Sequence, residues 1–297
     1  MNIKTKTTFG FRKAFSLIEI SVVILIIGIL IAGISQGIDM YNDFNLAKAR
    51  NITKNSRVGR ISNLELWLET TLEESFKTSE RRDNSSISVW NDINIQSSQK
   101  RSASQSTLAN QSKLIFQAFN KSIPAVRFDG GDYYPFDSAF MNGADFTIFV
   151  VEQRTSGSNN SFFIGGGSNG VFHLGYSGAS LIRVGQYGTA GVNLFDYTIP
   201  TFSSTQITSR IHTFTLTSAN GKKYWLNGGS TPEGSSVNNS LLSQYSGYIG
   251  VAEIGATTPL YYTGDIGEII IYSKELSTKE RNDVEDYLSK KYGIIIS

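Results

Sequence analysis

The chain has 297 residues, of which 40% are hydrophobic and 12% aromatic, a composition typical of a folded protein rather than a disordered one. It contains no cysteine, which excludes disulfides, thiolate zinc sites and cysteine nucleophiles, and its two histidines, His173 and His212, cannot form a three-histidine metal site. The net charge of +2 gives no overall basic field, so we expect no nucleic acid partner.

An apolar run near the N-terminus is long enough to cross a membrane. It extends from Phe15 to Ile34, and Glu19 is the only charged residue within it. As a helix, a run of this length spans about 30 Å, the thickness of a bilayer's hydrocarbon core. The cations that precede it are Lys4, Lys6, Arg12 and Lys13. They favour a cytoplasmic leader with the rest of the chain directed outward, so we predict a single-pass membrane protein.

Three interpretations of this segment are open. A secretory signal peptide would have an apolar core of about 7 to 15 residues and a small-residue cleavage site, which "IAGISQG" does not supply. A plain signal anchor would leave a charged group in the membrane at a cost of about 3 kcal/mol. Cleavage between Ala14 and Phe15 would instead create an α-amine one helical turn from Glu19, on the same side of the helix. Such an amine and carboxylate can pair between neighbouring copies and fix their register.

The stretch "KAFSLIEISVVILIIGILIAG" resembles the prepilin N-terminus of type IV pilins and type II secretion pseudopilins. By this resemblance, a prepilin peptidase cleaves after Ala14 and methylates the new N-terminus at Phe15. Glu19 then binds the N-terminus of an adjacent pilin or pseudopilin subunit. The family usually has glycine before the cut, so Ala14 predicts slower processing. The implied location is the inner membrane, with a cytoplasmic leader, followed by an extracytoplasmic pilus or pseudopilus.

Beyond about residue 58 the pattern changes to short strands separated by turns rich in Gly, Ser and Asn. The strands that we expect are 146–153, 169–176, 180–187, 211–217, 222–228, 247–251 and 265–273. Their spacing predicts an antiparallel sandwich rather than βαβ units. Asn220-Gly221 between two of these strands predicts a type I′ hairpin.

The C-terminus is predicted to be a helix. Ser277 and Glu280 have the spacing of a capping box, and Gly293 closes the helix. The predicted fold is therefore mainly β, with a long N-terminal helix, an antiparallel β-sandwich and a C-terminal helix. The predicted boundaries are a leader at 1–14, a membrane and assembly helix at 15–57, and the sandwich at 58–297.

Several pieces of this sandwich resemble the concanavalin A-like, laminin-G-like jelly-roll domains of bacterial surface proteins. The matching pieces are 64–69, 89–92, 124–134, 145–153, 219–228 and 263–294. The resemblance implies binding of glycans or surface proteins, sometimes through calcium, and a minority of relatives on this fold hydrolyse polysaccharides. Residues 93–113 match no strand pattern, and we expect a long surface loop there.

One turn, "FDGGDYYPF", offers candidate ligand-binding residues. Asp129 and Asp132 could present oxygens to calcium, and Tyr133 or Tyr134 could stack on a sugar. The alternative is a strand that ends in an Asp-Gly turn, because two carboxylates do not fill a calcium shell of six to eight oxygens. No other cofactor is expected. Five further aromatic residues are interpreted as core or cross-strand partners: Trp225, Tyr245, Tyr248, Tyr261 and Tyr262.

The sequence shows no catalytic motif that keeps its required context. "GGGSNG" at 165–170 matches a dinucleotide loop and a nucleophile elbow, but a strand rather than a helix follows it. Asp265 and Glu268 should point to opposite faces of one strand unless a bulge intervenes. His173 and His212 are interpreted as structural. We therefore expect that the protein is not an enzyme.

The pattern as a whole predicts a prepilin-type filament subunit that displays a lectin-like β-sandwich for adhesion or binding. A globular part of this size would crowd a shaft of many copies, which favours a minor pilin. One alternative is a pseudopilin of a type II secretion system. Another is a membrane-anchored surface glycan-binding protein that does not polymerise, and a third is a polysaccharide-active enzyme.

Overall fold

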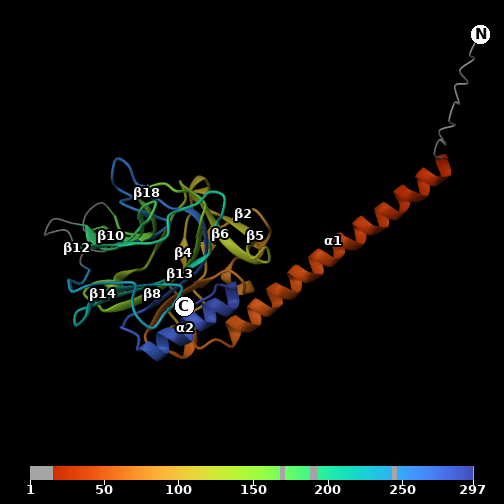
Figure 1. Cartoon of the computed structure of the whole chain (residues 1–297). Helices are drawn as coiled ribbons and strands as arrows, with labels where there is room; N and C mark the ends of the chain where they lie inside the picture. The colour runs from red at the N-terminus through yellow and green to blue at the C-terminus, as the bar shows by residue number, and fades with distance from the viewer. Residues whose placement is uncertain (1–15, 168–170, 188–192, 243–245, 297) are drawn as a thin grey trace, which may run out of the picture. The chain divides into compact units, whose positions relative to one another are not determined.

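The computed structural model describes residues 16–167, 171–187, 193–242 and 246–296 (Figure 1). The chain divides into two compact units, Met1–Phe44 and Asn45–Ser297, and each is described by itself below.

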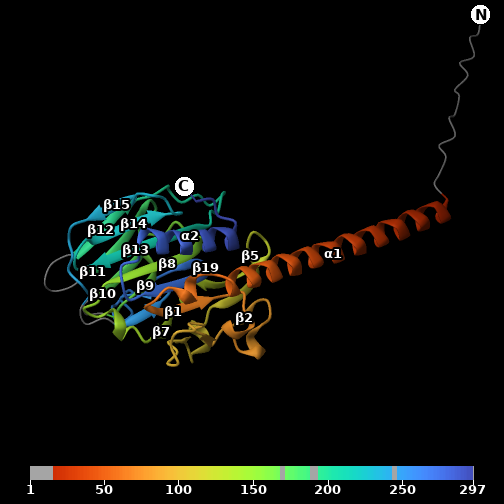
Figure 2. The same ribbon diagram turned by 90° about the horizontal axis from the view of Figure 1, so that it is seen from below.

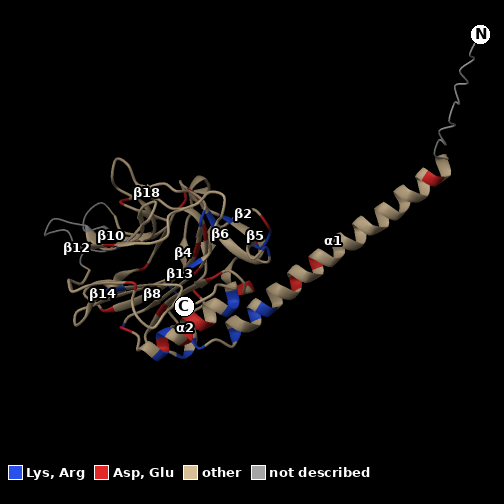
Figure 3. Ribbon diagram, in the orientation of Figure 1, with Lys and Arg blue, Asp and Glu red and all other residues tan. Residues whose placement is uncertain are grey.

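The first unit contains most of helix α1, which runs from Leu17 to Lys54. Every described residue from 16 to 41 is exposed, and these include Ile24 and Leu25, each about two-thirds exposed. After its first turn the helix carries no charged side chain over a long stretch (Figure 3). By length and composition, this is a helix that could cross a membrane, as the sequence predicts.

The second unit is built on two antiparallel sheets. The nine-stranded sheet has the order β15 (Gly234–Ser236), β14 (Gly221–Leu226), β13 (Arg210–Thr217), β8 (Phe146–Arg154), β19 (Thr263–Tyr272), β6 (Ile123–Asp129), β5 (Lys113–Phe119) and β2 (Ser85–Ser86), and β1 (Leu64–Glu69) pairs with β19. The six-stranded sheet has the order β12 (Asn193–Thr198), β11 (Leu181–Tyr187), β10 (Val171–Gly178), β9 (Ser161–Gly165), β16 (Gly247–Ile249) and β7 (Tyr134–Phe136).

Shorter elements connect these sheets. Two pairs of short strands are β3 (Val89–Trp90) with β4 (Ala103–Ser104), and β17 (Val251–Ala252) with β18 (Leu260–Tyr261). The 3₁₀ turns are η1 (Val58–Arg60), η2 (Glu73–Ser75), η3 (Thr78–Glu80), η4 (Leu108–Asn110) and η5 (Ala139–Met141).

Strand β8 shows why the central strands read as continuous apolar runs. Ile148 and Val150 belong to the core between the two sheets, while Phe149 and Val151 belong to a second core on the other face of the nine-stranded sheet. A strand buried on both faces needs apolar residues at every position. Figure 1 shows the resulting layers, with the sheet of β10 and β12, the sheet of β8 and β14, and helix α2 in succession. The predicted mainly β fold is confirmed.

Helix α2 (Thr278–Tyr292) covers that second face (Figure 2). The Ser277 hydroxyl accepts a hydrogen bond from the Glu280 amide, and a Glu280 carboxylate oxygen accepts one from the Ser277 amide at 2.9 Å. Gly293 takes the left-handed conformation, with φ 65°, at the C-terminal end. The predicted capping box and glycine cap are therefore confirmed.

The hairpin at Asn220-Gly221 forms with a different turn from the one predicted. Thr217 pairs with Gly221, which leaves a three-residue loop, and only Gly221 of the predicted turn pair has a positive φ (71°). The Thr217 hydroxyl closes the loop by accepting from the Asn220 amide at 2.9 Å. The Asn220 side chain donates instead to Glu275 at 2.7 Å. A three-residue loop with one left-handed glycine is the usual alternative to a type I′ turn.

The prediction of a long surface loop at 93–113 is wrong in part. This segment contains β4 and η4, and both Asn94 and Ala103 are buried. The Asp92 carboxylate holds its start, because one oxygen accepts from the amides of Trp67 and Asn94, each at 3.0 Å. Side chain to backbone hydrogen bonds of this kind leave no hydrophobic period in the sequence.

Candidate functional site

The predicted processing residues lie partly outside the described structure. Ala14 and Phe15 fall outside the described residues, so their geometry is not part of the site. Glu19 lies in the first turn of α1, is exposed, and accepts a hydrogen bond from the Ser16 amide at 2.8 Å. A carboxylate at this end of a helix is favoured by the helix dipole and by the unpaired amides.

The two predicted aspartates are turned toward their own backbone. An oxygen of Asp129 accepts from the Gly131 amide at 3.0 Å, and an oxygen of Asp132 accepts from the Asp129 amide at 3.0 Å. Asp132 is buried, and burial raises the pKa of its carboxyl group. A buried carboxyl with a raised pKa is a poor start for a calcium shell. Within the described ranges, no group of three or more His, Cys, Asp or Glu side chains could hold a metal ion.

The two predicted tyrosines have different roles. Tyr134 is fully buried, donates from its hydroxyl to the Ile87 carbonyl at 2.7 Å, and accepts from the Ser112 amide at 2.9 Å. Its proposed role as a sugar-stacking residue is therefore corrected: alternation along β7 points it into the core. Tyr133, the preceding residue, points the other way and stays partly exposed.

Tyr133 belongs to a group of three partly exposed tyrosines, which we call the tyrosine cluster. Its ring centroid lies 6.1 Å from that of Tyr248 on β16 and 6.3 Å from that of Tyr261 on β18. Strand pairing brings these residues together, because β16 pairs with β7 through Tyr248 and Pro135. All three residues were singled out in the sequence, but Tyr248 and Tyr261 were interpreted as core or cross-strand partners rather than as a ligand surface.

The loop before β5 fixes the orientation of Tyr133. Gln105 donates from its side chain to the Tyr133 carbonyl at 3.0 Å, and Asn110 donates from its side chain to the Tyr133 hydroxyl at 3.3 Å. The Tyr133 amide donates to the Asn110 carbonyl at 3.2 Å. A ring held in place before a ligand arrives loses less conformational entropy on binding. Tyr133 is therefore a preorganised member of the tyrosine cluster, and aromatic surfaces suit ligands with apolar faces and polar edges.

The other aromatic and glycine-rich candidates are structural where they are described. Trp225 stacks on Arg281, whose guanidinium carbon lies 4.4 Å from the ring centroid, and Tyr262 is fully buried. Tyr245 falls outside the described residues, as do residues 168–170 of the glycine-rich stretch. Gly165 ends β9, and a Cβ there would meet the Ala252 backbone at 2.4 Å, so glycine permits close packing of β17.

A buried polar group that was not predicted lies between the two sheets. We call it the Glu152 cluster: Glu152, Tyr176, Arg210, His212 and Tyr262. The Glu152 carboxylate accepts from the hydroxyls of Tyr176 at 2.6 Å and Tyr262 at 2.7 Å, and it lies 3.0 Å from Nε2 of His212. Arg210 donates to the Tyr176 hydroxyl at 3.0 Å. Burial alone would raise the pKa of Glu152, but His212 and Arg210 hold it below its usual value.

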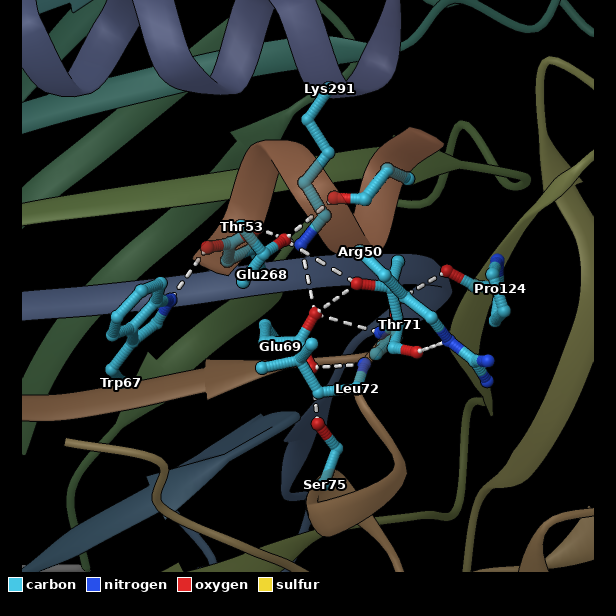
Figure 4. Close-up of polar contacts among 12 residues, drawn as sticks. Arg50, Thr53, Trp67, Glu69, Thr71, Leu72, Ser75, Pro124, Glu268 and Lys291 are labelled. Carbon is cyan, nitrogen blue, oxygen red and sulfur yellow. Dashed lines mark hydrogen bonds and ion pairs between the residues drawn. The ribbon is translucent and has the colours of Figure 1, made fainter. Parts of the chain in front are cut away.

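A second buried polar group, the Lys291 cluster, lies between β1, β19 and α2 (Figure 4). The Lys291 ammonium lies 2.9 Å from a Glu69 oxygen and 2.8 Å from a Glu268 oxygen, and all three side chains are fully buried. Glu268 also accepts from the Trp67 indole at 2.6 Å and from the Tyr287 hydroxyl at 2.7 Å. Burial alone would lower the pKa of Lys291, but Glu268 and Glu69 outweigh it and raise that pKa.

The Lys291 cluster also corrects the expectation for Asp265 and Glu268. The pairing of β19 with β8 shifts register between Ile266 and Glu268. Ile266 and Ile269 both face the core between the sheets. Their neighbours Asp265 and Glu268 therefore both lie on the other face of the nine-stranded sheet. They have separate partners: Arg127 forms two hydrogen bonds with Asp265, at 2.7 and 2.8 Å, and Lys291 pairs with Glu268.

No family model matches this chain, and no curated protein matches it. Among solved structures, a variant of Trypanosoma rangeli sialidase with trans-sialidase activity matches 86% of this chain and 39% of its own, at 11% identity and a TM-score of 0.50. The Trypanosoma rangeli sialidase in complex with sialic acid matches 77% of this chain and 33% of its own, at 15% identity and a TM-score of 0.49. Domain 4 of an extracellular arabinanase from Geobacillus stearothermophilus, in complex with arabinotriose, matches 59% of this chain and 81% of its own, at 17% identity and a TM-score of 0.44.

The chain spans about a third of the length of the sialidases that it matches. At these identities the likeness shows the fold alone. Our expectation that the protein is not an enzyme is nevertheless corrected, because a sialidase variant with trans-sialidase activity shares this fold. The lack of a recognisable catalytic motif in the sequence therefore does not exclude catalysis.

Proposed function

We propose that this protein is a membrane-anchored carbohydrate-binding protein, with its β-sandwich outside the cytoplasm and its tyrosine cluster as the binding surface. The tyrosine cluster carries the proposal, because it combines three partly exposed aromatic rings in one place. The exposed apolar part of α1 supports the anchor, and the basic residues before it support the outward orientation. The fold shared with a sialidase variant is consistent with a carbohydrate ligand.

Binding would use both parts of each tyrosine. The ring face packs against the C–H face of a sugar, and the phenolic hydroxyl exchanges hydrogen bonds with sugar hydroxyls. Asp129 is exposed in the turn that leads to Tyr133, and its carboxylate adds a hydrogen-bond acceptor. Such sites bind weakly per contact, so specificity depends on how firmly the rings are held.

We expect the substitution Tyr133→Ala to weaken binding to the best glycan on an array by about fivefold, since one aromatic contact contributes about 1 kcal/mol. Tyr261→Ala should have a similar effect. The measurement is a titration of the full chain in detergent micelles against that glycan. Tyr133→Phe keeps the ring and is the control, with a smaller loss expected. Unchanged affinity in both alanine variants would remove the tyrosine cluster from the proposal.

A second candidate function is that of a filament subunit of the type IV pilin or pseudopilin kind, processed by a prepilin peptidase. The observation that favours it is the exposed Glu19 carboxylate in the first turn of a helix whose described residues from 16 to 41 are all exposed. In this function the carboxylate pairs with the methylated amine of Phe15 in a neighbouring subunit. Inner-membrane insertion would then precede assembly.

For this second function we expect Glu19→Ala to abolish incorporation into filaments while leaving membrane insertion unchanged, because removing the acid lowers the cost of insertion. Incorporation is measured by the protein content of sheared filaments. Asp39→Ala, which removes another exposed acid of the same helix, is the matched control. Mature protein that still begins at Met1, seen by N-terminal sequencing, would reject the filament function.

A further inference from the structure

A small cavity lies beside the C-terminal end of α1, and none of its lining residues belongs to the tyrosine cluster. Its volume is about 300 Å³, and its apolar walls include Leu46, Phe76 and Phe116. Arg50 and Arg81 are its cationic groups, and we call the cavity the arginine pocket. Phe116 is 38% exposed, so one aromatic side chain is available to a ligand at the mouth.

Both arginines are held in place by main-chain carbonyls. Nε of Arg50 donates to the Thr71 carbonyl at 2.7 Å, as Figure 4 shows, and Nε of Arg81 donates to the Phe76 carbonyl at 3.0 Å. Fixing Nε leaves the terminal nitrogens of each guanidinium for other partners. Two oriented guanidinium groups on one cavity are suited to a planar anion such as a carboxylate.

A single carboxylate, that of Glu73, lies between the two arginines. Its two oxygens are 3.6 Å from Nη1 of Arg50 and 3.6 Å from Nη1 of Arg81. These distances are longer than hydrogen bonds, and the Glu73 side chain is 66% exposed. One loosely held, exposed carboxylate thus faces two cations, and the pocket retains a charge of +1 among these three groups. Displacing Glu73 into solvent costs little, because exposed ion pairs contribute little.

We propose that the arginine pocket binds the carboxylate of an acidic sugar, such as a uronic acid, with Glu73 occupying the arginines until the ligand replaces it. The proposal rests on the carbohydrate-binding function above and names a ligand class for a second site. The cavity volume suits one or two sugar rings, and Phe116 offers a ring for stacking. A peptide C-terminus carries the same carboxylate, and the test below distinguishes it from the sugar.

The proposal predicts opposite effects for the two kinds of charged residue. Glu73→Ala removes the competing carboxylate and should raise affinity for an acidic sugar. Arg81→Ala removes one of the two guanidinium groups and should lower it. Binding should also weaken as salt is raised, since the pocket is partly exposed.

The test uses the full chain in detergent micelles and two matched probes, α-1,4-linked trigalacturonate and its fully methyl-esterified form. We expect the wild-type protein to bind the acid about tenfold more tightly than the ester, as one charge-assisted contact implies. Arg81→Ala should abolish this difference, and Glu73→Ala should increase it. Arg82→Ala removes the exposed cation that follows Arg81 in the sequence, and it should leave the difference in affinity between acid and ester unchanged. Because Arg81 also donates to the Phe76 carbonyl, the melting temperature of Arg81→Ala is compared with that of the wild type.

Equal affinity of the wild-type protein for the acid and the ester would overturn this inference, as would a difference that survives in Arg81→Ala. In either case the proposed function would still stand if the wild-type protein bound a neutral glycan and Tyr133→Ala did not. Absence of binding to every glycan would instead reject the proposed function. Binding of a hexapeptide with a free C-terminus, as tight as that of the acid and dependent on Arg81, would reject the sugar as the ligand.

Discussion

Replacing Lys291 by methionine is expected to lower the free energy of unfolding by about 3 to 5 kcal/mol. In the wild-type protein, the Lys291 ammonium lies 2.9 Å from Glu69 and 2.8 Å from Glu268. Without it, both carboxylates would remain fully buried and have no cation to share. The pKa of Glu268 is already raised, with burial as the largest cause, so this carboxyl would take up a proton first. Other hydrogen bonds to the two acids cannot replace the lost charge.

The measurement for Lys291→Met is guanidinium unfolding of the full chain in detergent, followed by tryptophan fluorescence. All three tryptophans lie in the second unit, so the signal reports on the sandwich and not on the membrane helix. The matched control is Lys290→Met, since the Lys290 side chain is 71% exposed and its ion pair with Asp286 is long, at 3.9 Å. We expect less than about 0.5 kcal/mol for the control. A loss below about 1 kcal/mol in Lys291→Met would contradict the buried ion pairs.

The substitution Glu152→Ala is expected to have an effect of similar size, about 3 kcal/mol or more. It would leave the hydroxyls of Tyr176 and Tyr262 and Nε2 of His212 without their acceptor in a fully buried position. It would also leave the buried Arg210 without a nearby negative charge. Each orphaned donor costs about 1 to 3 kcal/mol, although the costs within one cluster are not additive.

The same unfolding experiment tests Glu152→Ala. Gln153→Ala is the control, because Gln153 is the next residue on β8, is partly exposed and has one side-chain hydrogen bond, to Ser209 at 2.9 Å. Glu152→Gln keeps the volume and one acceptor oxygen, so its loss should be intermediate. If Glu152→Ala were no more destabilising than Gln153→Ala, the Glu152 cluster would have no structural importance.

The sequence predicted those parts of the fold that depend on local pattern. The apolar run of β8 and the capping residues of α2 each determine an element through their own side chains, and both predictions were confirmed. The predicted type of turn at Asn220-Gly221 was wrong, because Asn220 has other partners. Its amide donates to the Thr217 hydroxyl and its side chain donates to the Glu275 carboxylate. Such competition depends on the position of Glu275, which lies 55 residues further along the chain.

The candidate site could be predicted only in fragments, because strand pairing assembles it. Tyr133, Tyr248 and Tyr261 come from three strands or their borders, and their spacing in sequence has no period. Glu152 is a polar residue near the end of an apolar strand, and Lys291 is a cation in the last turn of a helix, so neither position by itself predicts a buried cluster. Glu152 and Lys291 are buried by partners far away in the sequence, which no local pattern shows.

The most direct test of the account is whether membranes that contain this protein bind carbohydrate through the tyrosine cluster. Liposomes reconstituted with the full chain would be incubated with beads that carry the best glycan from the array, and the captured lipid would be measured. We expect capture by the wild-type protein and almost none by a variant with Tyr133, Tyr248 and Tyr261 all replaced by alanine. Equal capture by the two proteins, or no capture by the wild type when the chain is firmly inserted, would contradict the account.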